Sequence, residues 1–253
     1  MEILNAIKVC DASFFYAEKA RKNKACDAEK YVFKNLNFNL QKGTVCSVLG
    51  ANGSGKTTFL KCLIGLLKLA SGSIYIEEKE QKSIKNCELL NKVSYVPQSK
   101  TIFGIKVFDM VLLGRIGKTS IFSEPTQEDI DFAKNALELL GIESLSEKKM
   151  DEISGGQQQL VFLARAIAGG AKILILDEPE MSLDLKNRTK ILETFKKLAE
   201  SGYSVLFTTH EILSARKFSN NSLLCLNYDN WIFGKSKEVL TDENIYNAFG
   251  VLL

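Results

Sequence analysis

No apolar run in the sequence approaches the roughly 20 residues that a helix needs to cross a bilayer. The nearest stretch, from Phe59 to Leu69, is short and contains lysine. The first residues, MEILNAIKVC, also lack the basic-then-apolar layout of a secretion signal. These absences argue against a membrane-spanning chain and lead us to expect a cytoplasmic protein.

An excess of charge of one sign is also missing. The 253 residues include 33 basic and 30 acidic side chains, which gives a formal charge of +3. This balance excludes a surface dedicated to nucleic acid or anionic lipid. We therefore expect no nucleic-acid partner, and we expect any link to a membrane to run through another protein.

Cysteine pairs of the CxxC type are absent, and a chain of this length buries a core without disulfides. We expect reduced, mostly buried thiols at Cys10, Cys26, Cys46, Cys62, Cys87 and Cys225.

Apolar, β-rich runs occur at Thr44–Leu49, Lys172–Leu176 and Ser204–Thr208. Each run ends in turn signals and precedes a helical or polar segment. This alternation predicts a parallel sheet covered by helices, an α/β fold. Alternating and aromatic residues between Ile3 and Leu40 predict antiparallel strands, and the charged run from Glu18 to Lys30 within them predicts a solvated loop.

The pattern changes between Lys106 and Leu140, where GIKVFDMVLLGR and EDIDFAKNALELLGI read as amphipathic helices. No strand signal separates them, so we expect a helical insert. A short hydrophobic run, Ser222–Leu226, and the tail LTDENIYNAFGVLL follow the third strand of the sheet.

The segment GANGSGKT matches GxxxxGK[ST], and it stands between the strand TVCSVL and the apolar segment TFLKCLIGLL. Glycines let successive N–H groups point at phosphate oxygens, at a helix N-terminus that favours anions. Lysine supplies positive charge, the first threonine a hydroxyl for Mg2+, and the second threonine a further phosphate contact. The alternative is a glycine turn that binds nothing. The predicted nucleotide-binding residues are Gly50, Asn52, Gly53, Ser54, Gly55, Lys56, Thr57 and Thr58.

The segment KILILDEP is a predicted buried strand that delivers two consecutive carboxylates. Asp177 would hold Mg2+ through water, and Glu178 would orient and deprotonate the attacking water. We expect the alternation of side chains along the strand to point the two acids in different directions. The alternative is that both acids merely begin a loop.

His210 is the single histidine, and it follows the strand SVLFTT directly. This placement puts it at the edge where parallel α/β sheets bind ligands. We expect its imidazole to bind the terminal phosphate, although a lone histidine is usually incidental.

The segment ISGGQ, from Ile153 to Gln157, precedes the apolar run LVFLARAIA. The order GANGSGKT, VPQ, ISGGQ, LILDEP, SLD and a strand ending in His is similar to that of the nucleotide-binding subunit of ABC transporters, over nearly the whole chain. In that family the LSGGQ helix end binds the γ-phosphate of ATP held by the opposite subunit. The resemblance implies an ATPase that uses Mg2+, works as a head-to-tail homodimer and contacts its twin's ATP through Ser154, Gly155, Gly156 and Gln157. The alternative is a plain serine N-cap at Ser154.

Other roles follow from the resemblance alone. Gln98 would touch Mg2+ or the attacking water and link the core to the helical insert. Ser182, Leu183 and Asp184 would form the D-loop between the two sites.

Tyr16 is our choice for the aromatic that stacks on adenine. Phe15 and Tyr31 are also available, and the loop between them is longer than usual in the family. Simple core packing is the alternative role for Tyr16.

One departure from the family is Glu180 with Met181, where a threonine and a small residue commonly follow DEP. We expect the extra carboxylate to add negative charge near Asp177 and Glu178, with an effect on hydrolysis rate or metal preference.

The resemblance implies one ABC domain over 1–253, with a P-loop NTPase core of the RecA type and an N-terminal antiparallel β subdomain. The core would cover about 1–97 and 158–253, and a helical ABC-specific subdomain about 98–157. The segment KVFDMVLLGRIG has the residues of a groove for a partner's helix, with core packing as the alternative. The implied partners are ATP, permease subunits and, indirectly, an extracytoplasmic substrate-binding protein, with the chain on the inner face of the cell membrane.

Three segments, VFDMVLLGRIG, QEDIDFAKNALELLGI and LTDENIYNAFGV, are similar to importers for ferric siderophores, haem or cobalamin. We expect an iron chelate as cargo, and the alternatives are cobalamin, zinc, manganese or molybdate. Two rival functions keep the nucleotide site: a non-transport ABC ATPase of DNA repair or the ribosome, and a P-loop kinase. The absence of long inserts and basic excess disfavours the first, and ISGGQ disfavours the second.

Overall fold

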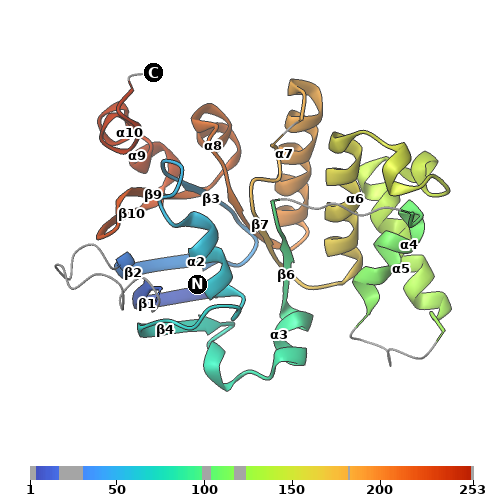
Figure 1. Ribbon diagram of the computed structural model, residues 1–253, viewed down its shortest axis with the longest axis horizontal. Helices are drawn as coiled ribbons and strands as arrows, with labels where there is room; N and C mark the ends of the chain where they lie inside the picture. Colours follow the sequence, from blue (N-terminus) through green and yellow to red (C-terminus); the bar gives the residue numbers. More distant parts are fainter. Residues whose placement is uncertain (1–3, 17–30, 99–103, 117–123, 182, 252–253) are drawn as a thin grey trace.

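The computed structural model describes residues 4–16, 31–98, 104–116, 124–181 and 183–251 (Figure 1). The charged run from Glu18 to Lys30 and the D-loop residue Ser182 lie outside these ranges. Two β-sheets occupy the centre and one side of the molecule, and a group of helices lies at the opposite end.

The larger sheet has the strand order β10-β9-β3-β8-β7-β6, and only β10 runs antiparallel to its neighbour. Strands β3, β7 and β8 are buried at every position, because helices and the second sheet cover both faces. These strands confirm the parallel sheet expected from the sequence. Its members are β3 (Val45–Leu49), β6 (Val93–Val96), β7 (Ile173–Leu176), β8 (Ser204–Thr208), β9 (Asn221–Asn227) and β10 (Asn230–Lys235).

The smaller sheet is antiparallel, as expected for the N-terminal part of the chain. Its strands are β1 (Asn5–Phe15), β2 (Tyr31–Gln41), β4 (Ser71–Ile76) and β5 (Lys79–Glu80). Phe33 and Phe38 of this sheet pack edge-on against Phe59 of helix α2, and Phe33 also contacts Trp231 of β10. An aromatic core therefore joins the two sheets through α2.

The helices cover both faces of the larger sheet. In β7, Ile173 and Ile175 join the core shared with the smaller sheet, whereas Leu174 and Leu176 face the core made by the other helices. The α-helices are α2 (Lys56–Leu63), α3 (Asn86–Lys92), α4 (Val107–Leu112), α5 (Gln127–Leu140), α6 (Gly155–Ala168), α7 (Leu185–Glu200), α8 (Ile212–Phe218), α9 (Ser236–Val239) and α10 (Asp242–Phe249). Short 3-10 turns are η2 (Gln81–Ser83), η3 (Leu113–Arg115), η4 (Glu143–Leu145) and η5 (Met150–Glu152).

The expected helical insert is present as α4 and α5, which pack against α6 at the end of the molecule away from the antiparallel sheet (Figure 1). Thr126 begins α5 with a capping box, and Gly141 ends it in the left-handed conformation. Helix α6 is continuous through residue 157, the boundary that the sequence analysis set between insert and core. Among the described residues, none of the helices is both long and apolar enough to span a membrane.

Candidate nucleotide-binding and hydrolytic site

The phosphate loop connects β3, which ends at Leu49, to α2, which begins at Lys56. Gly53 and Gly55 have φ angles of +76° and +98°, in the region that favours glycine. A Cβ added at Gly55 would lie 2.5 Å from the Cγ1 atom of Val32 in β2. The smaller sheet therefore holds the loop against the start of α2, with backbone N–H groups at a helix N-terminus.

Lys56 lies against this loop. Its Nζ atom donates to the carbonyl oxygens of Gly50 and Ala51 at 2.8 and 3.0 Å. Burial lowers the pKa of the lysine, and the nearby carboxylates of Glu178 and Asp177 act in the opposite direction. The charged amine is thus already fixed beside the position that the loop provides for phosphates.

A pocket of about 560 Å³ opens over the loop. It is bounded by aromatic residues from β1 and β2, by the phosphate loop, and by the end of β9. The described residues that line it are Tyr16, Tyr31, Val32, Asn52, Gly53, Ser54, Gly55, Lys56, Thr57, Thr58, Gln98, Glu178, Cys225, Asn227 and Tyr228. The Ser54 hydroxyl is buried and has no hydrogen-bond partner in the described part of the chain, as expected of a group that contacts a phosphate.

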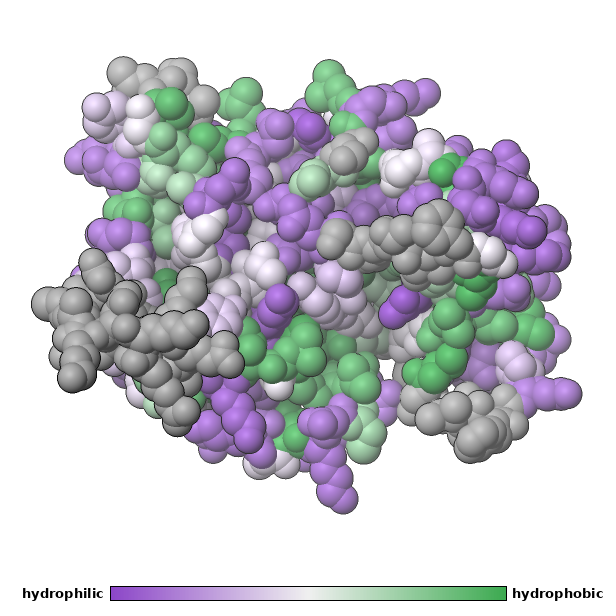
Figure 2. All heavy atoms as spheres, viewed as in Figure 1, coloured by the Kyte–Doolittle hydropathy of each residue, from purple (hydrophilic) through white to green (hydrophobic). Residues whose placement is uncertain are grey.

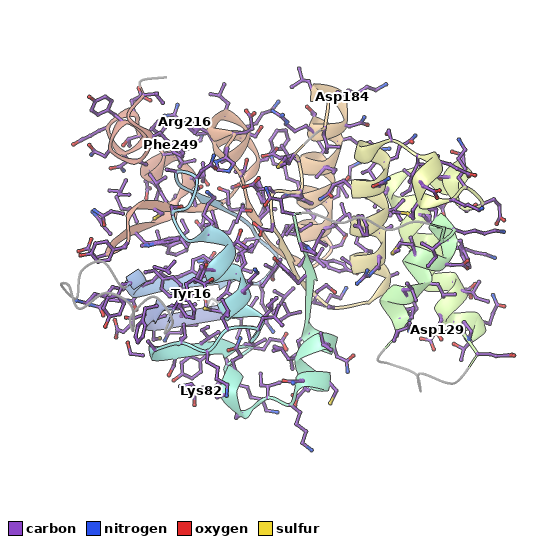
Figure 3. All side chains as sticks on the ribbon, viewed as in Figure 1. Tyr16, Lys82, Asp129, Asp184, Arg216 and Phe249 are labelled. Carbon is purple, nitrogen blue, oxygen red and sulfur yellow. The ribbon has the colours of Figure 1, made fainter. Side chains whose placement is uncertain are left out.

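The aromatic candidates differ in position. Tyr16 and Tyr31 line the pocket, and Phe15 is not among the described lining residues. The hydroxyl of Tyr16 lies 3.1 Å from Thr58 Oγ1, and its ring packs edge-on against Phe14 at 4.9 Å. Tyr16 is labelled beside β1 in Figure 3. Its ring is therefore held at the pocket and is not buried in the core.

Asp177 follows the last residue of β7 and is buried. Its Oδ2 atom accepts from Thr57 Oγ1 at 2.7 Å, and its Oδ1 atom accepts from Thr208 Oγ1 at 2.7 Å. A carboxylate beside a threonine hydroxyl is the set of hard oxygen donors that Mg2+ prefers, with water completing the coordination. The residues present therefore fit this metal.

The side chain of Glu178 contacts two other predicted site residues, His210 and Gln98. Its Oε1 atom lies 2.7 Å from His210 Nε2, and its Oε2 atom accepts from Gln98 Nε2 at 2.7 Å. Its own N–H donates to Thr208 Oγ1 at 2.7 Å. The chain thus brings together a carboxylate, an imidazole and an amide beside the phosphate loop.

The expected reason for the divergence of Asp177 and Glu178 is wrong. The sequence analysis relied on alternation along a strand, but β7 ends at Leu176, before either acid. Instead, Glu178 has a φ angle of +48°, in the left-handed region, and this backbone turn redirects its side chain.

The ISGGQ segment and Asp184 are not among the described lining residues of the pocket. Ser154 caps helix α6, because its hydroxyl accepts from the Gln157 N–H and the Gln157 side chain accepts from the Ser154 N–H. Asp184 caps α7, because its carboxylate accepts from the Asn187 N–H, and Figure 3 labels it at the start of α7, far from Tyr16. A Cβ added at Gly156 would lie 2.9 Å from Leu183 Cδ2, so these two segments touch.

A model of the ABC transporter family matches residues 33–181, more than half of the chain. The chain belongs to the ABC transporter family. A molybdate import ATP-binding protein of Haemophilus influenzae is 35% identical to this ABC cassette, over 96% of this chain and 88% of the relative. The chelated iron transport protein YfeB of Yersinia pestis is 34% identical, over 87% of this chain and 74% of the relative. A manganese transport ATP-binding protein of Bacillus subtilis is 32% identical, over 88% of each chain.

Solved structures agree with this assignment. An inward-facing structure assigned to the metal-chelate type of ABC transporter is 33% identical, with a TM-score of 0.83 over 98% of this chain and 90% of that one. A dimeric, post-hydrolysis ATP-binding cassette bound to ADP and phosphate is 29% identical, with a TM-score of 0.77 over 91% and 98%. The ABC cassette described here is therefore an ATP-hydrolysing domain with the P-loop NTPase fold.

The structure gives Glu180 a specific hydrogen-bond partner. Its carboxyl group does not face the pocket of the cassette but accepts a hydrogen bond from the Thr209 hydroxyl. The residue is 4% exposed, and burial raises the pKa of the carboxyl. Its bonded oxygen is therefore directed at Thr209, in the segment that carries His210.

Several residues of the ABC site escaped the sequence analysis. Thr208 bonds both Asp177 and Glu178, and Cys225, Asn227 and Tyr228 line the pocket from the end of β9. One signal was available, because parallel strands end at the same edge of the sheet and the residues that follow them meet there. The sequence analysis used this rule for His210 but not for β9.

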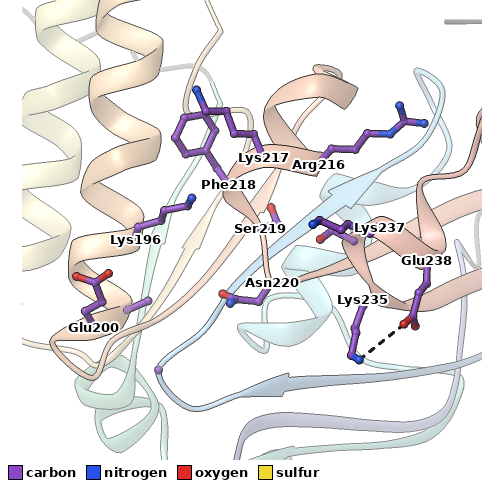
Figure 4. A pocket seen from close by; sticks show the side chains of 13 residues that line it. Lys196, Glu200, Arg216, Lys217, Phe218, Ser219, Asn220, Lys235, Lys237 and Glu238 are labelled. Atoms are coloured by element: carbon purple, nitrogen blue, oxygen red, sulfur yellow. Dashed lines mark ion pairs between the residues drawn. The ribbon is translucent and has the colours of Figure 1, made fainter.

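A second cavity of about 620 Å³ lies elsewhere, between α7, α8 and the β10–α9 region (Figure 4). Its described lining is rich in lysine, including Lys196 and Lys237, and includes none of the predicted site residues. The nucleotide chemistry of the cassette therefore belongs to the smaller pocket over the phosphate loop.

Proposed function

We propose that this cassette hydrolyses ATP as a homodimer, in which each nucleotide is shared by the phosphate loop of one copy and the ISGGQ helix of the other. The observation that carries the proposal is the composition of the site. One copy supplies the phosphate loop, Glu178 and His210, while Ser154 begins a helix that is not part of the same pocket. A helix N-terminus that binds anions is then available to a second copy.

The hydrolytic step uses groups that the chain already holds in place. The loop N–H groups and Lys56 bind the phosphates, and Thr57 and Asp177, with Gln98, would hold Mg2+. The metal supplies charge stabilisation to the terminal phosphate. Glu178 takes a proton from the attacking water, since each of its oxygens keeps a second lone pair beside the bonds from His210 and Gln98.

An apolar groove supports a permease as partner. A cavity of about 410 Å³ is lined by residues of α2–α3, β6, η3 and α6, and Leu66, Leu90 and Ile116 in its lining are 66%, 70% and 56% exposed. Figure 2 shows hydrophobic side chains gathered over α3 and the end of α4. Exposed apolar side chains around a groove mark an interaction site, and a helix of a membrane subunit fits it. Through this contact the cassette would sit on the inner face of the cell membrane.

The proposed transport is import of an iron chelate, delivered by an extracytoplasmic substrate-binding protein. The relative named for chelated iron and the structure of metal-chelate type support this cargo. Relatives named for molybdate and manganese support other metal cargoes equally well. A cargo that crosses the permease need not touch the cassette, so the residues of the cassette do not distinguish an iron chelate from molybdate or manganese.

The proposal is tested by reconstitution of the cassette in proteoliposomes with the permease that co-purifies with it. We expect ATP-dependent uptake of a radiolabelled ferric siderophore, and no uptake with Glu178→Gln. Uptake of molybdate or Mn2+ instead of the siderophore would contradict the proposed cargo but would support the transport function. ATP hydrolysis that drives no uptake, with salt-sensitive binding to DNA or ribosomes, would contradict the transport function itself.

A further inference from the structure

We propose that Glu180 is a positioning residue for His210, and through the bond from His210 for Glu178, and that it acts by anchoring Thr209. The inference rests on the hydrolytic roles proposed above for those two residues. It goes beyond them because Glu180 is not among the described residues that line the pocket.

The Thr209 hydroxyl is fixed from two sides. It donates to Glu180 Oε1, and it accepts from the Glu211 N–H at 2.9 Å. Thr209 and Glu180 are 1% and 4% exposed, so water cannot replace either bond. These contacts hold the backbone on both sides of His210.

His210 depends on that backbone for its position. Its side chain is 37% exposed, and its only hydrogen bond within the described ranges is the one to Glu178 at 2.7 Å. The place of the imidazole is therefore set by Thr209 and Glu211, its neighbours in the chain, and by Glu178 itself. A shift of the backbone would lengthen the bond to Glu178.

Two adjacent threonines at the end of β8 bond different residues of the acidic segment, which runs from Asp177 to Glu180. Thr208 bonds Asp177 and the N–H of Glu178, while Thr209 bonds Glu180. Because the two hydroxyls bond different residues, they hold the acidic segment at two separate places. The segment that carries Glu178 is thus tied to the segment that carries His210 both before and after the reacting carboxylate.

Helix α7 also contacts this group of residues, through Arg188. Arg188 Nη1 pairs with Glu211 Oε1 at 2.7 Å, and the Arg188 charge acts on Glu180 to lower the pKa that burial raises. Glu180 Oε2 and Arg188 Nε are both buried without a hydrogen-bond partner in the described part of the chain. Arg188 lies in the first turn of α7, and its N–H donates to the carbonyl oxygen of the cap residue Asp184. Glu180, Thr209, Glu211 and Arg188 therefore connect the acidic segment, the His210 segment and the start of α7.

The test compares Glu180→Met, which keeps the volume but removes the acceptor, with Glu180→Gln, which keeps a carbonyl oxygen for Thr209. The kcat and KM for ATP and the midpoint of thermal unfolding are measured for each, alone and in a His210→Ala background. Thr209→Val removes the same bond from the other side. Thr194→Val is the matched control, because Thr194 is also buried and donates to a carbonyl within α7.

We expect Glu180→Met and Thr209→Val each to lower kcat by roughly tenfold with KM within about twofold, since small displacements of a reacting group cost rate steeply. Glu180→Gln should rescue kcat to within about twofold of wild type, and Thr194→Val should leave it unchanged. In the His210→Ala background, Glu180→Met should cause no further loss of kcat, because its effect passes through His210.

Loss of kcat by the same factor in both backgrounds would overturn the inference, and so would a Glu180→Gln variant as slow as Glu180→Met. If His210→Ala alone hydrolyses ATP at the wild-type rate, the role proposed for His210 fails, which is a separate outcome. Unfolding midpoints of Glu180→Met and Thr209→Val that match that of Thr194→Val show that their loss of kcat is not a loss of folding.

Discussion

Glu178, the carboxylate to which we assign the proton transfer, is held by several hydrogen bonds. Both of its carboxylate oxygens have a nitrogen partner at 2.7 Å, and its backbone N–H is bonded to Thr208. Such a network restricts the carboxylate to one orientation before substrate arrives, and pre-organisation of this kind is a main source of catalytic rate. The role of the residue can therefore be tested with a change that keeps its shape.

For Glu178→Gln we expect ATP binding to persist while hydrolysis falls by roughly 10²- to 10⁴-fold, because the amide cannot accept the proton of the attacking water. ATP should then trap the protein as a dimer, visible by light scattering after size exclusion. Phosphate release without any acceptor is the activity assay. Glu193→Gln, an exposed change on α7, is the control and should hydrolyse normally. Brisk turnover by Glu178→Gln would contradict the role of Glu178.

At the scale of elements, a buried ion pair joins α5 to η3. Arg115 Nε donates to Asp129 Oδ1 at 2.7 Å, and Asp129 also bonds both the hydroxyl and the N–H of Thr126. The guanidinium lies 4.0 Å from the centre of the Phe132 ring. Hydrogen bonds from Thr126 and from Arg115 lower the pKa of Asp129 to about 2.

Asp129→Asn should reduce the free energy of unfolding by an amount on the order of 2 kcal/mol at pH 7. The folded-state pKa is lower than that of the unfolded chain, so the wild-type advantage is complete above the ordinary pKa of aspartate. It should disappear as pH falls from about 4 through about 2. Urea unfolding across this pH range measures it, and Asp131→Asn on the exposed face of α5 is the control. A difference independent of pH would refute the assignment.

The contact between η3 and α6 depends on a glycine. A Cβ added at Gly114 would lie 2.2 Å from the carbonyl oxygen of Arg165. Gly114→Ala should therefore separate η3 from α6 and lower the free energy of unfolding by about 1–3 kcal/mol. In Gly155→Ala the added Cβ meets no described atom within 4 Å, so its unfolding midpoint should stay near wild type. Equal midpoints for both variants would disprove the close packing of η3.

Elements differ in how well the sequence predicted them. Strands β3, β7 and β8 were predicted because complete burial produces continuous apolar runs. Strand β10 was not, since its residues NWIFGK are only partly buried and carry no clear alternation. The phosphate loop was predictable because its chemistry needs a fixed local spacing. The contact between Glu180 and Thr209 was not predictable, because the two residues are 29 positions apart and neither residue type indicates the other as its partner.

At the scale of the whole molecule, the shared site that we propose is complete only when a second copy is present. Copies with Lys56→Ala and copies with Ser154→Arg should each be inactive alone as homodimers. A mixture should recover part of the wild-type rate, because the mixed dimer contains one site with both changes and one with neither. Phosphate release from the mixture measures the recovery, and nucleotide binding by Ser154→Arg alone should persist. A mixture as inactive as its components would count against the shared site.

The left-handed backbone at Glu178 has an evolutionary consequence. A residue other than glycine in this region costs roughly 1 kcal/mol or more, so the folded state is less stable by that amount at the residue to which we assign the proton transfer. A laboratory selection for thermal tolerance alone would favour glycine there, and it would yield a sturdier protein that no longer turns over ATP.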